Sequence, residues 1–319
     1  MTIEETLLHI WQQISHAVQE CHQVTLHLHK NGSSSKSAIY KSISHAESEL
    51  QHFASLLKLT KILIEHLQTA GKQTTVRDIY YRDVELFNKS QPKCKSLLTE
   101  IVNSLSWSLT RHLNIHPTQK GLFFGYNIFK TMIKEPVLIP IEYEDNFANQ
   151  LCINRDSKLV LVILEKDAVF ESFCKYLLQK NTDKIPAQIL LVTGKGFADS
   201  LTLRFIKWFL TLYPSCKCIG FFDSDAYGLN IFNQFETKIE NSMKFGGAYM
   251  FKSEPITWLN IPRRDLSVLV ASSTKFVNSH PECHRELTRG AFLMKKAEMN
   301  IAPGDYNECL VKELNKFLT

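Results

Sequence analysis

The 319-residue sequence lacks the features of several broad protein classes. No apolar run approaches the roughly 20 residues that a membrane-spanning helix needs, so we expect no contact with a membrane. The first residues, Met1 to Glu5, are acidic and unlike a signal peptide. The eight cysteines are irregularly spaced, and the single close pair, Cys216 and Cys218, adjoins an apolar run. We therefore expect reduced thiols, no zinc site and an intracellular protein.

The composition is that of an ordinary globular protein. Hydrophobic residues make up 44% of the chain and charged residues 22%, which is enough for a substantial core. The formal net charge of +5 is compatible with nucleic-acid binding, but many unrelated proteins have a similar charge. The length allows two domains, and no internal repeat is visible.

Three apolar runs in the second half of the chain have no polar alternation, which is typical of parallel strands covered on both faces. The segments between them have helical spacing and are long enough for right-handed crossovers. The runs are Leu159 to Leu164, Ile189 to Val192 and Cys218 to Phe222, and the helical segments are Ala168 to Gln179 and Asp199 to Leu212. This pattern predicts an α/β domain with a mainly parallel sheet.

Each run is followed by residues that could bind a metal or take part in catalysis. Glu165 follows the first, Gly194-Lys195-Gly196 the second, and Asp223-Ser224-Asp225 the third. The carboxyl ends of parallel strands meet at one edge of a sheet, so the three carboxylates should gather there. Carboxylate oxygens suit Mg²⁺, with Mn²⁺ as a substitute, and do not favour zinc. Glu165, Asp223 and Asp225 are therefore predicted metal ligands.

These motifs also have simpler interpretations. An Asp-x-Asp after a strand is often an ordinary turn, and a single Glu there is more often without function. The Gly-Lys-Gly turn is no phosphate-binding P-loop, because no glycine precedes it at the required spacing and no Ser or Thr follows Lys195. A calcium loop is excluded, since Tyr227 and Gln234 stand where that loop needs an oxygen ligand and a bidentate Glu.

The first half of the chain is mostly helical. Apolar residues at helical spacing predict helices over residues 3–20, 49–69 and 94–113, and Thr74 or Thr75 can cap another. The first helix either packs on its own domain or is offered to a partner. A short extended pair at 121–129 resembles a wing, so we predict a winged-helix DNA-binding domain. The expected domains are an N-terminal helix and hinge at 1–38, the winged helix at 39–145, and an α/β domain with a helical extension at 146–319.

A pair of tyrosines, Tyr80 and Tyr81, falls on the capped helix. Such a pair is usually structural, with one ring packed and the other facing solvent. Arg77 lies four residues before Tyr81 and shares its helix face. A phenol has a pKa of about 10, and a guanidinium beside it favours the phenolate and can clamp a phosphate. Arg77 could instead form a surface ion pair with Asp78 or Asp83.

Four segments together resemble a family that comprises the eukaryotic meiotic double-strand-break transesterase and its relative, the topoisomerase VI A subunit: 74–87, 164–170, 194–199 and 223–228. The resemblance runs from about residue 73 to 300 and identifies the α/β domain as a Toprim domain. Ala198 and Ala226 stand where the family commonly has proline. The resemblance implies that Tyr81 is the nucleophile, that Arg77 assists it, and that the Toprim carboxylates hold Mg²⁺.

The resemblance also implies how the reaction and the assembly are organised. Tyr81 of one protomer would meet the metal site of another, so a self-dimer would cut duplex DNA and stay linked to its 5′ ends. Lys120, Lys195, Phe197 and Arg264 match positions expected to contact DNA, and Lys166 would hold a phosphate or carboxylate. A topoisomerase VI B-like subunit is expected at the N-terminal helices, and a WD-repeat protein near residues 284–300. The expected location is the nucleus, on chromosomes.

Other functions stay open at this point. A type IIB topoisomerase A subunit would share the catalytic residues and also reseal the break. A non-catalytic DNA-binding scaffold would keep the fold without cutting, although the intact set of catalytic residues argues against it. A Toprim nuclease would not need the tyrosine segment. The favoured prediction is a DNA-cleaving transesterase that initiates meiotic homologous recombination.

Overall fold

The computed structural model describes residues 2–29, 37–69, 73–144, 147–154, 157–179, 187–247, 259–261, 265, 267–268, 280–299 and 305–319. The chain divides into two compact units, Met1–Thr118 and Gln119–Thr319, which we call the N-terminal unit and the C-terminal unit. This division falls well before the boundary that we expected at residue 145. Residues 1–38, which we expected to stand apart, belong to the same unit as the helices that follow them.

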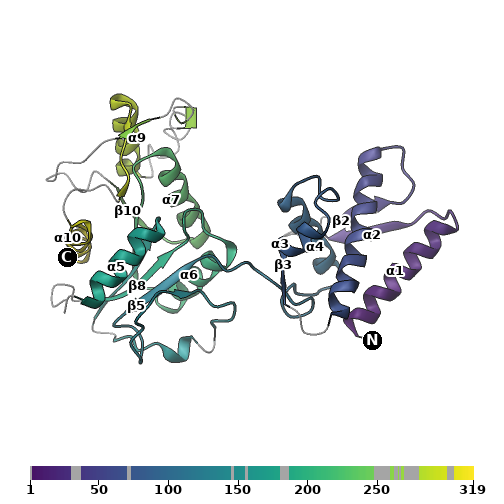
Figure 1. The fold of residues 1–319 in the computed structure, drawn as a ribbon, viewed down its shortest axis with the longest axis horizontal. Coiled ribbons are helices and arrows are strands. Elements are labelled where there is room, and N and C mark those ends of the chain that lie inside the picture. The colour runs from purple at the N-terminus through teal and green to yellow at the C-terminus, as the bar shows by residue number, and fades with distance from the viewer. Residues whose placement is uncertain are drawn as a thin grey trace. The chain divides into compact units, whose positions relative to one another are not determined.

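The N-terminal unit is mostly helical (Figure 1). Its helices are α1 (Ile3–Gln19), α2 (Glu47–Gln68), α3 (Val76–Arg82) and α4 (Gln91–Ser104). Its strands form two short pairs, antiparallel β1 (Thr25–His29) with β2 (Ser37–Lys41) and parallel β3 (Thr74–Thr75) with β4 (Ile115–His116). The predicted helices at 3–20 and 49–69 are therefore confirmed. The hinge that we expected at 31–35 lies outside the described residues.

One apolar core unites these helices. Leu7 of α1 is buried against a cluster that includes Leu59 and Leu63 of α2 and Leu97 of α4. The apolar face of α1 thus packs on its own unit, which was one of our two interpretations. The helix predicted at 94–113 is shorter than expected, because it ends at Ser104 and Ser106 adopts a left-handed backbone with φ 55°. Its leucine spacing nevertheless reflects burial, since Leu113 is in the core.

The C-terminal unit is built on a six-stranded sheet in the order β10-β9-β7-β8-β5-β6. Strands β10, β9, β7 and β8 are mutually parallel, and β5 and β6 add antiparallel neighbours at one side. The strands are β5 (Leu122–Tyr126), β6 (Val137–Leu138), β7 (Lys158–Leu164), β8 (Ala187–Thr193), β9 (Lys217–Phe221) and β10 (Lys244–Gly246). The mainly parallel sheet that we predicted is confirmed.

Helices cover both faces of this sheet (Figure 1). Residues of β7 alternate between two cores: Leu161 and Ile163 face α6 (Ser200–Leu212) and α7 (Ala226–Ile239), while Val160 and Val162 face α5 (Asp167–Gln179) and α10 (Tyr306–Leu318). Burial on both sides explains why the strand sequences show no polar alternation. Smaller elements are the turn η1 (Ala148–Gln150), the antiparallel pair β11 (Leu259–Asn260) and β12 (Lys295–Lys296), and helix α9 (Pro281–Leu293).

The hairpin that we predicted as a wing belongs to this sheet, so that assignment was wrong. Strand β5 pairs antiparallel with β8 over five residues, from Leu122 opposite Thr193 to Tyr126 opposite Ile189. Its neighbouring residues Phe123 and Phe124 point to opposite faces and are both buried, one in each core. A wing strand would leave one face in solvent. The pairing of β5 also explains why the units divide at Thr118 and not near residue 145.

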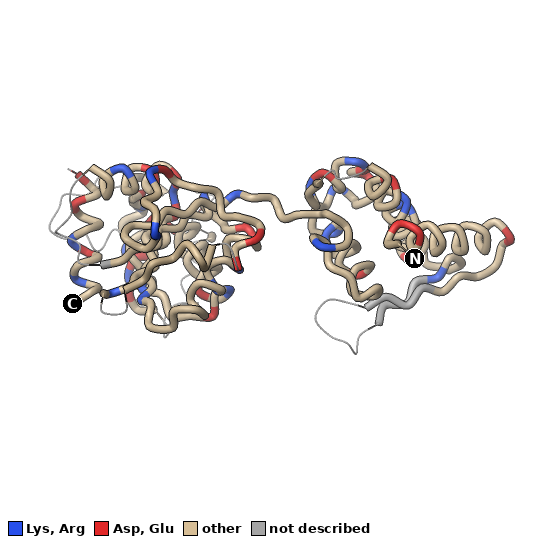
Figure 2. The backbone as a smooth tube through the Cα atoms, turned by 90° about the horizontal axis from the view of Figure 1, so that it is seen from below, with Lys and Arg blue, Asp and Glu red and all other residues tan. Residues whose placement is uncertain are grey.

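Charged residues of both signs are interspersed along each unit (Figure 2). This distribution agrees with the small net charge of +5 and gives no single-sign field over either unit. Among the helices that the structure describes, none combines the length and apolar character required to cross a membrane.

Candidate functional site

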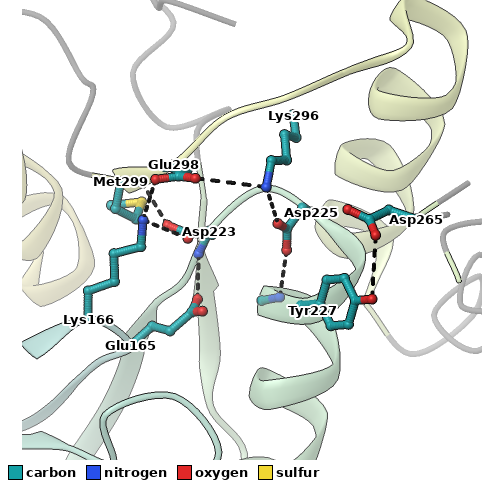
Figure 3. Close-up of polar contacts among 10 residues, drawn as sticks. Glu165, Lys166, Asp223, Asp225, Tyr227, Asp265, Lys296, Glu298 and Met299 are labelled. Atoms are coloured by element: carbon teal, nitrogen blue, oxygen red, sulfur yellow. Dashed lines mark hydrogen bonds and ion pairs between the residues drawn. The ribbon is translucent and has the colours of Figure 1, made fainter. Parts of the chain in front are cut away.

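Two of the three predicted metal ligands lie in direct contact at the carboxyl ends of β7 and β9. The backbone N–H of Asp223 donates to Oε2 of Glu165 at 2.8 Å, and the N–H of Glu165 donates to the carbonyl of Phe221 at 3.1 Å. The strands β7 and β9 are adjacent and parallel, so their ends bring the two acids together. This part of the predicted convergence is confirmed (Figure 3).

The third acid, Asp225, begins helix α7. Its Oδ1 accepts a hydrogen bond from the N–H of Gly228 at 2.8 Å, which makes it the N-cap of that helix. Gly228 fits there because it has no side chain: a Cβ at this position would lie 2.3 Å from the carbonyl oxygen of Asp223. The Asp-x-Asp turn therefore packs tightly against the first turn of α7, which fixes the direction of both aspartates.

Burial makes ionisation of this pair unfavourable. Burial and, to a smaller extent, the charge of the Asp223 carboxylate raise the pKa of Glu165 to about 8. Burial also raises the pKa of Asp223, although its hydrogen bond from Met299 and the charge of Lys166 act in the opposite direction. A cation bound beside these two carboxylates would favour their ionised forms.

Two lysines and a further acid surround the carboxylates. The ammonium Nζ of Lys166 lies 3.0 Å from Asp223 Oδ2 and 2.7 Å from Glu298 Oε2, and Nζ of Lys296 lies 3.4 Å from Asp225 Oδ2. Burial lowers the pKa of Lys166, but its bonds to Glu298 and Asp223 outweigh this, so the pKa is raised. The carboxylate partner that we expected for Lys166 is present.

Lys296, Glu298 and Met299 had no role in our sequence interpretation beyond family likeness. They reach the site because Ser224 and Ala297 form an isolated antiparallel bridge, in which the N–H of Ser224 donates to the carbonyl of Ala297 at 2.8 Å. The N–H of Met299 then donates to Oδ1 of Asp223, also at 2.8 Å. The alternation of Lys296 and Glu298 in an extended segment was the one available sequence signal, since it places both on one side.

The Gly-Lys-Gly turn follows β8 and is bonded to the same edge. The N–H of Gly196 donates to the carbonyl of Glu165 at 2.9 Å. Lys195 has a left-handed backbone, with φ 53°, and its Nζ lies 2.9 Å from Asp167 Oδ2 at the start of α5. The side chain of Lys195, predicted to contact DNA, is thus ion-paired within the unit in this structure.

Two other predicted DNA contacts lie side by side. Nζ of Lys120 donates to the carbonyl of Phe197 at 2.9 Å, and the backbone N–H of Lys120 donates to Oδ2 of Asp199 at 3.1 Å. The ring of Phe197 is 49% exposed, so simple packing does not explain its presence in the turn. Arg264, the remaining predicted contact, lies outside the described residues.

The predicted nucleophile lies on α3 in the N-terminal unit. Thr75 caps this helix by accepting from the N–H of Asp78, as expected from the sequence. Tyr81 is 58% exposed, whereas Tyr80 packs against the core, with its ring 6.0 Å from that of Phe87. The expectation that one ring packs and the other faces solvent is therefore confirmed.

Arg77 contacts Tyr81 directly. Its Nη2 donates to the hydroxyl oxygen of Tyr81 at 3.3 Å, and its guanidinium carbon lies 5.6 Å from the ring centroid. The hydrogen bond to Tyr81 raises the pKa of Arg77. The alternative partners are engaged elsewhere, since Asp78 caps α3 and Asp83 pairs with Lys58. The shared helix face predicted from the four-residue spacing is thus confirmed.

The donor set at the sheet edge has the chemistry of a site for a hard divalent cation. Glu165, Asp223, Asp225 and Glu298 contribute carboxylates, whereas Lys166 and Lys296 contribute ammonium groups, so full ionisation leaves two negative charges. Carboxylate oxygens suit Mg²⁺ or Mn²⁺. In this conformation, no three acid, His or Cys side chains within the described ranges are spaced to hold a metal together. The residue types and their net charge therefore fit Mg²⁺ or Mn²⁺. In this structure the carboxylate oxygens bond to donors of the protein itself.

The residues that we predicted thus fall into two sets. Glu165, Asp223 and Asp225 lie on the C-terminal unit, together with Lys120, Lys195 and Phe197. Tyr81 and Arg77 lie on the N-terminal unit.

Comparisons with known proteins match both sets. A model of the type IIB DNA topoisomerase family matches residues 51–115, which include Arg77 and Tyr81. A model of the Toprim domain that Spo11 shares with the A subunit of topoisomerase 6 matches residues 159–302, which include the carboxylates, Lys296 and Glu298.

Similar proteins come from fungi and animals. The meiosis-specific protein SPO11 of Saccharomyces cerevisiae is 32% identical, over 79% of this chain and 72% of that protein. The meiotic recombination protein rec12 of Schizosaccharomyces pombe is 31% identical, over 70% of this chain and 66% of that protein. The human meiotic recombination protein SPO11 is 28% identical, over 71% of this chain and 56% of that protein.

Proposed function

Since this chain belongs to the family of Spo11 and the topoisomerase 6 A subunit, we propose that it is a DNA-cleaving transesterase that makes meiotic double-strand breaks. The break starts homologous recombination, and Tyr81 stays bound to the DNA through a 5′-phosphotyrosyl bond. The names of the fungal and human relatives, which refer to meiosis and meiotic recombination, support the process.

The observation that carries the proposal is the arrangement of Arg77 and Tyr81 on α3. The Tyr81 hydroxyl is exposed and accepts a hydrogen bond from Arg77, while the neighbouring Tyr80 is packed. A guanidinium at this position stabilises a phenolate and can also hold a phosphate oxygen. Tyr81 therefore has both the access and the charged neighbour that a nucleophile requires.

The chemical step exchanges one phosphodiester for another. The Tyr81 oxygen attacks phosphorus, the bond from phosphorus to the 3′ oxygen breaks, and the phenol proton is lost as the 3′ hydroxyl gains one. No water is consumed, so the phosphodiester energy is kept in the protein–DNA bond. Arg77 acts on the side of the nucleophile, where it stabilises the phenolate and orients the phosphate.

We assign Glu165, Asp223 and Asp225 as the residues that would hold Mg²⁺, or Mn²⁺ in its place. The charge of the cluster and the raised pKa values of Glu165 and Asp223 support this assignment. When bound there, the cation would supply positive charge for the phosphate and the leaving oxygen. Gly228 and Met299 fix the orientation of the two aspartates through their backbone N–H groups.

The proposed substrate is double-stranded DNA, held through its backbone with little base specificity. Lys120, Lys195, Phe197 and Arg264 are the proposed contacts. Lys120 is bonded to the turn that carries the exposed Phe197, so these two would act together. For Lys195, DNA binding would require its ion pair with Asp167 to open or to be shared with a phosphate.

The catalytic residues lie on two units, which supports a site shared between protomers. We propose that Tyr81 of one protomer acts at the carboxylates of another, so that a dimer cuts both strands. A topoisomerase VI B-like subunit would bind the N-terminal unit, and a WD-repeat protein the region 284–300. The exposed residues Phe292, Leu293 and Met294 support a contact there. The proposed location is the nucleus, on chromosomes.

Covalent capture tests the proposal. The protein is incubated with duplex DNA, Mg²⁺ or Mn²⁺ and its partner subunits, then denatured, and protein bound to 5′ ends is measured. Tyr81→Phe should give no adduct, since its ring has no nucleophilic oxygen. Tyr80→Phe is the matched control, because it removes the neighbouring hydroxyl, and it should keep adduct formation within about twofold.

Mixing two inactive variants tests the shared site. Glu165→Ala should also be inactive alone. A mixed dimer of Tyr81→Phe and Glu165→Ala has one complete site if the site is shared, and it should cut one strand; a site within one protomer predicts no cutting. Cleavage by Tyr81→Phe would instead indicate a hydrolytic nuclease, and tight DNA binding with no adduct from any form would favour a scaffold. Resealing of the captured break would identify a topoisomerase A subunit.

A further inference from the structure

Five charged side chains form one continuous chain of ion pairs across the carboxylate edge (Figure 3). The order is Asp223, Lys166, Glu298, Lys296 and Asp225, with nitrogen-to-oxygen distances of 3.0, 2.7, 3.8 and 3.4 Å. Each lysine thus bridges one proposed metal ligand and Glu298. The arrangement is symmetrical in its chemistry: Glu298 stands between the two ammonium groups, and an aspartate stands at each end.

Backbone pairing places two of these side chains, Lys296 and Glu298, beside the aspartates. Ala297 pairs with Ser224, which lies between the two aspartates, so Lys296 and Glu298 are fixed on either side of that bridge. Lys296 also belongs to β12, which pairs with β11. The five side chains are largely shielded, with exposures that range from 8% for Asp223 to 29% for Glu298. Ion pairs shielded in this way are screened less by solvent than surface pairs.

Each oxygen of the two aspartates already has a protein donor. Asp223 accepts from the N–H of Met299 at Oδ1 and from Lys166 at Oδ2. Asp225 accepts from the N–H of Gly228 at Oδ1 and from Lys296 at Oδ2. The backbone donors are fixed by the fold, whereas the lysine side chains can rotate away. An incoming cation would therefore compete with the lysines for Oδ2 of each aspartate.

We propose that Lys166 and Lys296 are resident counter-charges of the metal ligands, which a divalent cation must displace, and that Glu298 retains the displaced lysines. This inference rests on the metal assignment made under the proposed function. Because Glu298 contacts both ammonium groups, each lysine can leave its aspartate and keep one ionic partner. The two positive charges then remain beside the cation, where they are available to the phosphate of the DNA substrate.

Manganese titration of the full chain without DNA tests this competition, with bound Mn²⁺ measured by electron paramagnetic resonance. Lys296→Met removes one competitor and should raise the Mn²⁺ affinity about tenfold, and Lys166→Met should act in the same direction. Lys295→Met is the matched control. This substitution removes the same charge as Lys296→Met, but Lys295 donates to Asn260 and not to a proposed metal ligand. It should therefore alter the Mn²⁺ affinity less than twofold.

Glu298→Gln distinguishes a lysine holder from a metal ligand. Without the Glu298 charge, the lysines should pair more strongly with the aspartates and lower the Mn²⁺ affinity severalfold. A direct ligand role predicts the same loss, but the double variant Lys296→Met/Glu298→Gln separates the two. Under our inference the double variant binds Mn²⁺ at least as tightly as the wild type, whereas loss of a ligand leaves it weaker.

The outcomes also separate this inference from the metal assignment. If Asp225→Asn abolishes the Mn²⁺ site but neither Lys296→Met nor Lys166→Met strengthens it, the assignment stands and the counter-charge role is wrong. If Asp225→Asn, Asp223→Asn and Glu165→Gln all leave Mn²⁺ binding unchanged, the metal lies elsewhere and the proposed catalytic site fails with it.

Discussion

The nucleophile helix and the carboxylate edge use the same type of residue in opposite ways. Asp78 of α3 and Asp83, the C-cap of that helix, lie near solvent and accept hydrogen bonds from Thr75 and Lys58, which lower their pKa values. At the carboxylate edge, burial raises the pKa values of Glu165 and Asp223. The acids of α3 thus stabilise the fold as anions, whereas those of the edge are unfavourable as anions until a positive charge compensates them. The difference suggests a way to recognise function, because only at the carboxylate edge do the pKa values stay raised although a lysine lies beside the acids.

The largest loss of local stability should come from adding an atom between the Asp-x-Asp turn and helix α7. Gly228→Ala would place a Cβ 2.3 Å from the carbonyl of Asp223, so the backbone that orients both aspartates must move. We expect about 3 kcal/mol of local destabilisation, and therefore amide hydrogen exchange across residues 221–240 that is about a hundredfold faster. Mn²⁺ binding should weaken with it, and exchange in the N-terminal unit should stay the same.

Asn230→Ala is the control for this substitution, since it changes a half-buried residue of the same helix, α7, without adding an atom beside the carbonyl of Asp223. It should leave exchange and Mn²⁺ binding near the wild-type values. Wild-type exchange in Gly228→Ala would show that the turn tolerates the extra atom, and the tight packing would then not explain the orientation of Asp223.

A smaller effect, with a distinct sign, should appear in the pH dependence of the metal-free protein. The pKa of Glu165 is raised, so between about pH 4.5 and 8 the folded state keeps a proton that the unfolded state has lost. The unfolding free energy of the C-terminal unit should therefore fall as the pH rises through this window. Glu165→Gln cannot ionise, so the difference between wild type and variant isolates the effect.

Urea unfolding in a chelating buffer at several pH values measures that difference. The wild type should lose stability relative to Glu165→Gln between pH 5 and pH 8, and added Mg²⁺ should reduce the loss because it favours the ionised pair. A difference that grows in favour of the wild type as the pH rises would mean that the carboxylate is already well compensated without a cation.

The sequence predicted the contact between Glu165 and Asp223 because it follows from the order of the strands. Three buried runs each end in a polar motif, and the carboxyl ends of neighbouring parallel strands must meet. The contact of Arg77 with Tyr81 was equally accessible, since four-residue spacing on a helix places both on one face. Thr75 was similarly recognisable as a residue suited to a helix N-terminus.

The features that we predicted wrongly or missed depend on contacts between segments far apart in the sequence. The hairpin at 121–129 has the local pattern of a wing, but its strand pairs with β8, and this choice depends on two cores that the local sequence does not reveal. Lys296 reaches Asp225 across 71 residues, and Glu298 reaches Lys166 across 132. The alternation of Lys296 and Glu298 indicates only that both lie on one side of an extended segment, and their partners appear only in the fold.

The smallest effect that we predict concerns the acids of α3 and completes the comparison. Asp83 pairs with Lys58 of α2 and accepts from the N–H of Leu86 at 3.0 Å, which connects the end of α3 to its neighbour. Asp83→Asn keeps an oxygen for Leu86 but loses the ion pair, and should lower the stability of the N-terminal unit by about 1 kcal/mol or less. The pKa of Asp83 is lowered by its bond to Lys58, so its contribution should be present at neutral pH and disappear as the pH falls through the folded pKa. Urea unfolding at pH 7 and pH 3 measures both values.

Glu85→Gln is the matched control, because the pair of Glu85 with Lys89 is more than 70% exposed and should contribute nothing measurable. If the two substitutions cost the same at pH 7, Asp83 does not anchor the nucleophile helix, and the exposed position of Tyr81 depends on the core packing of Tyr80 alone.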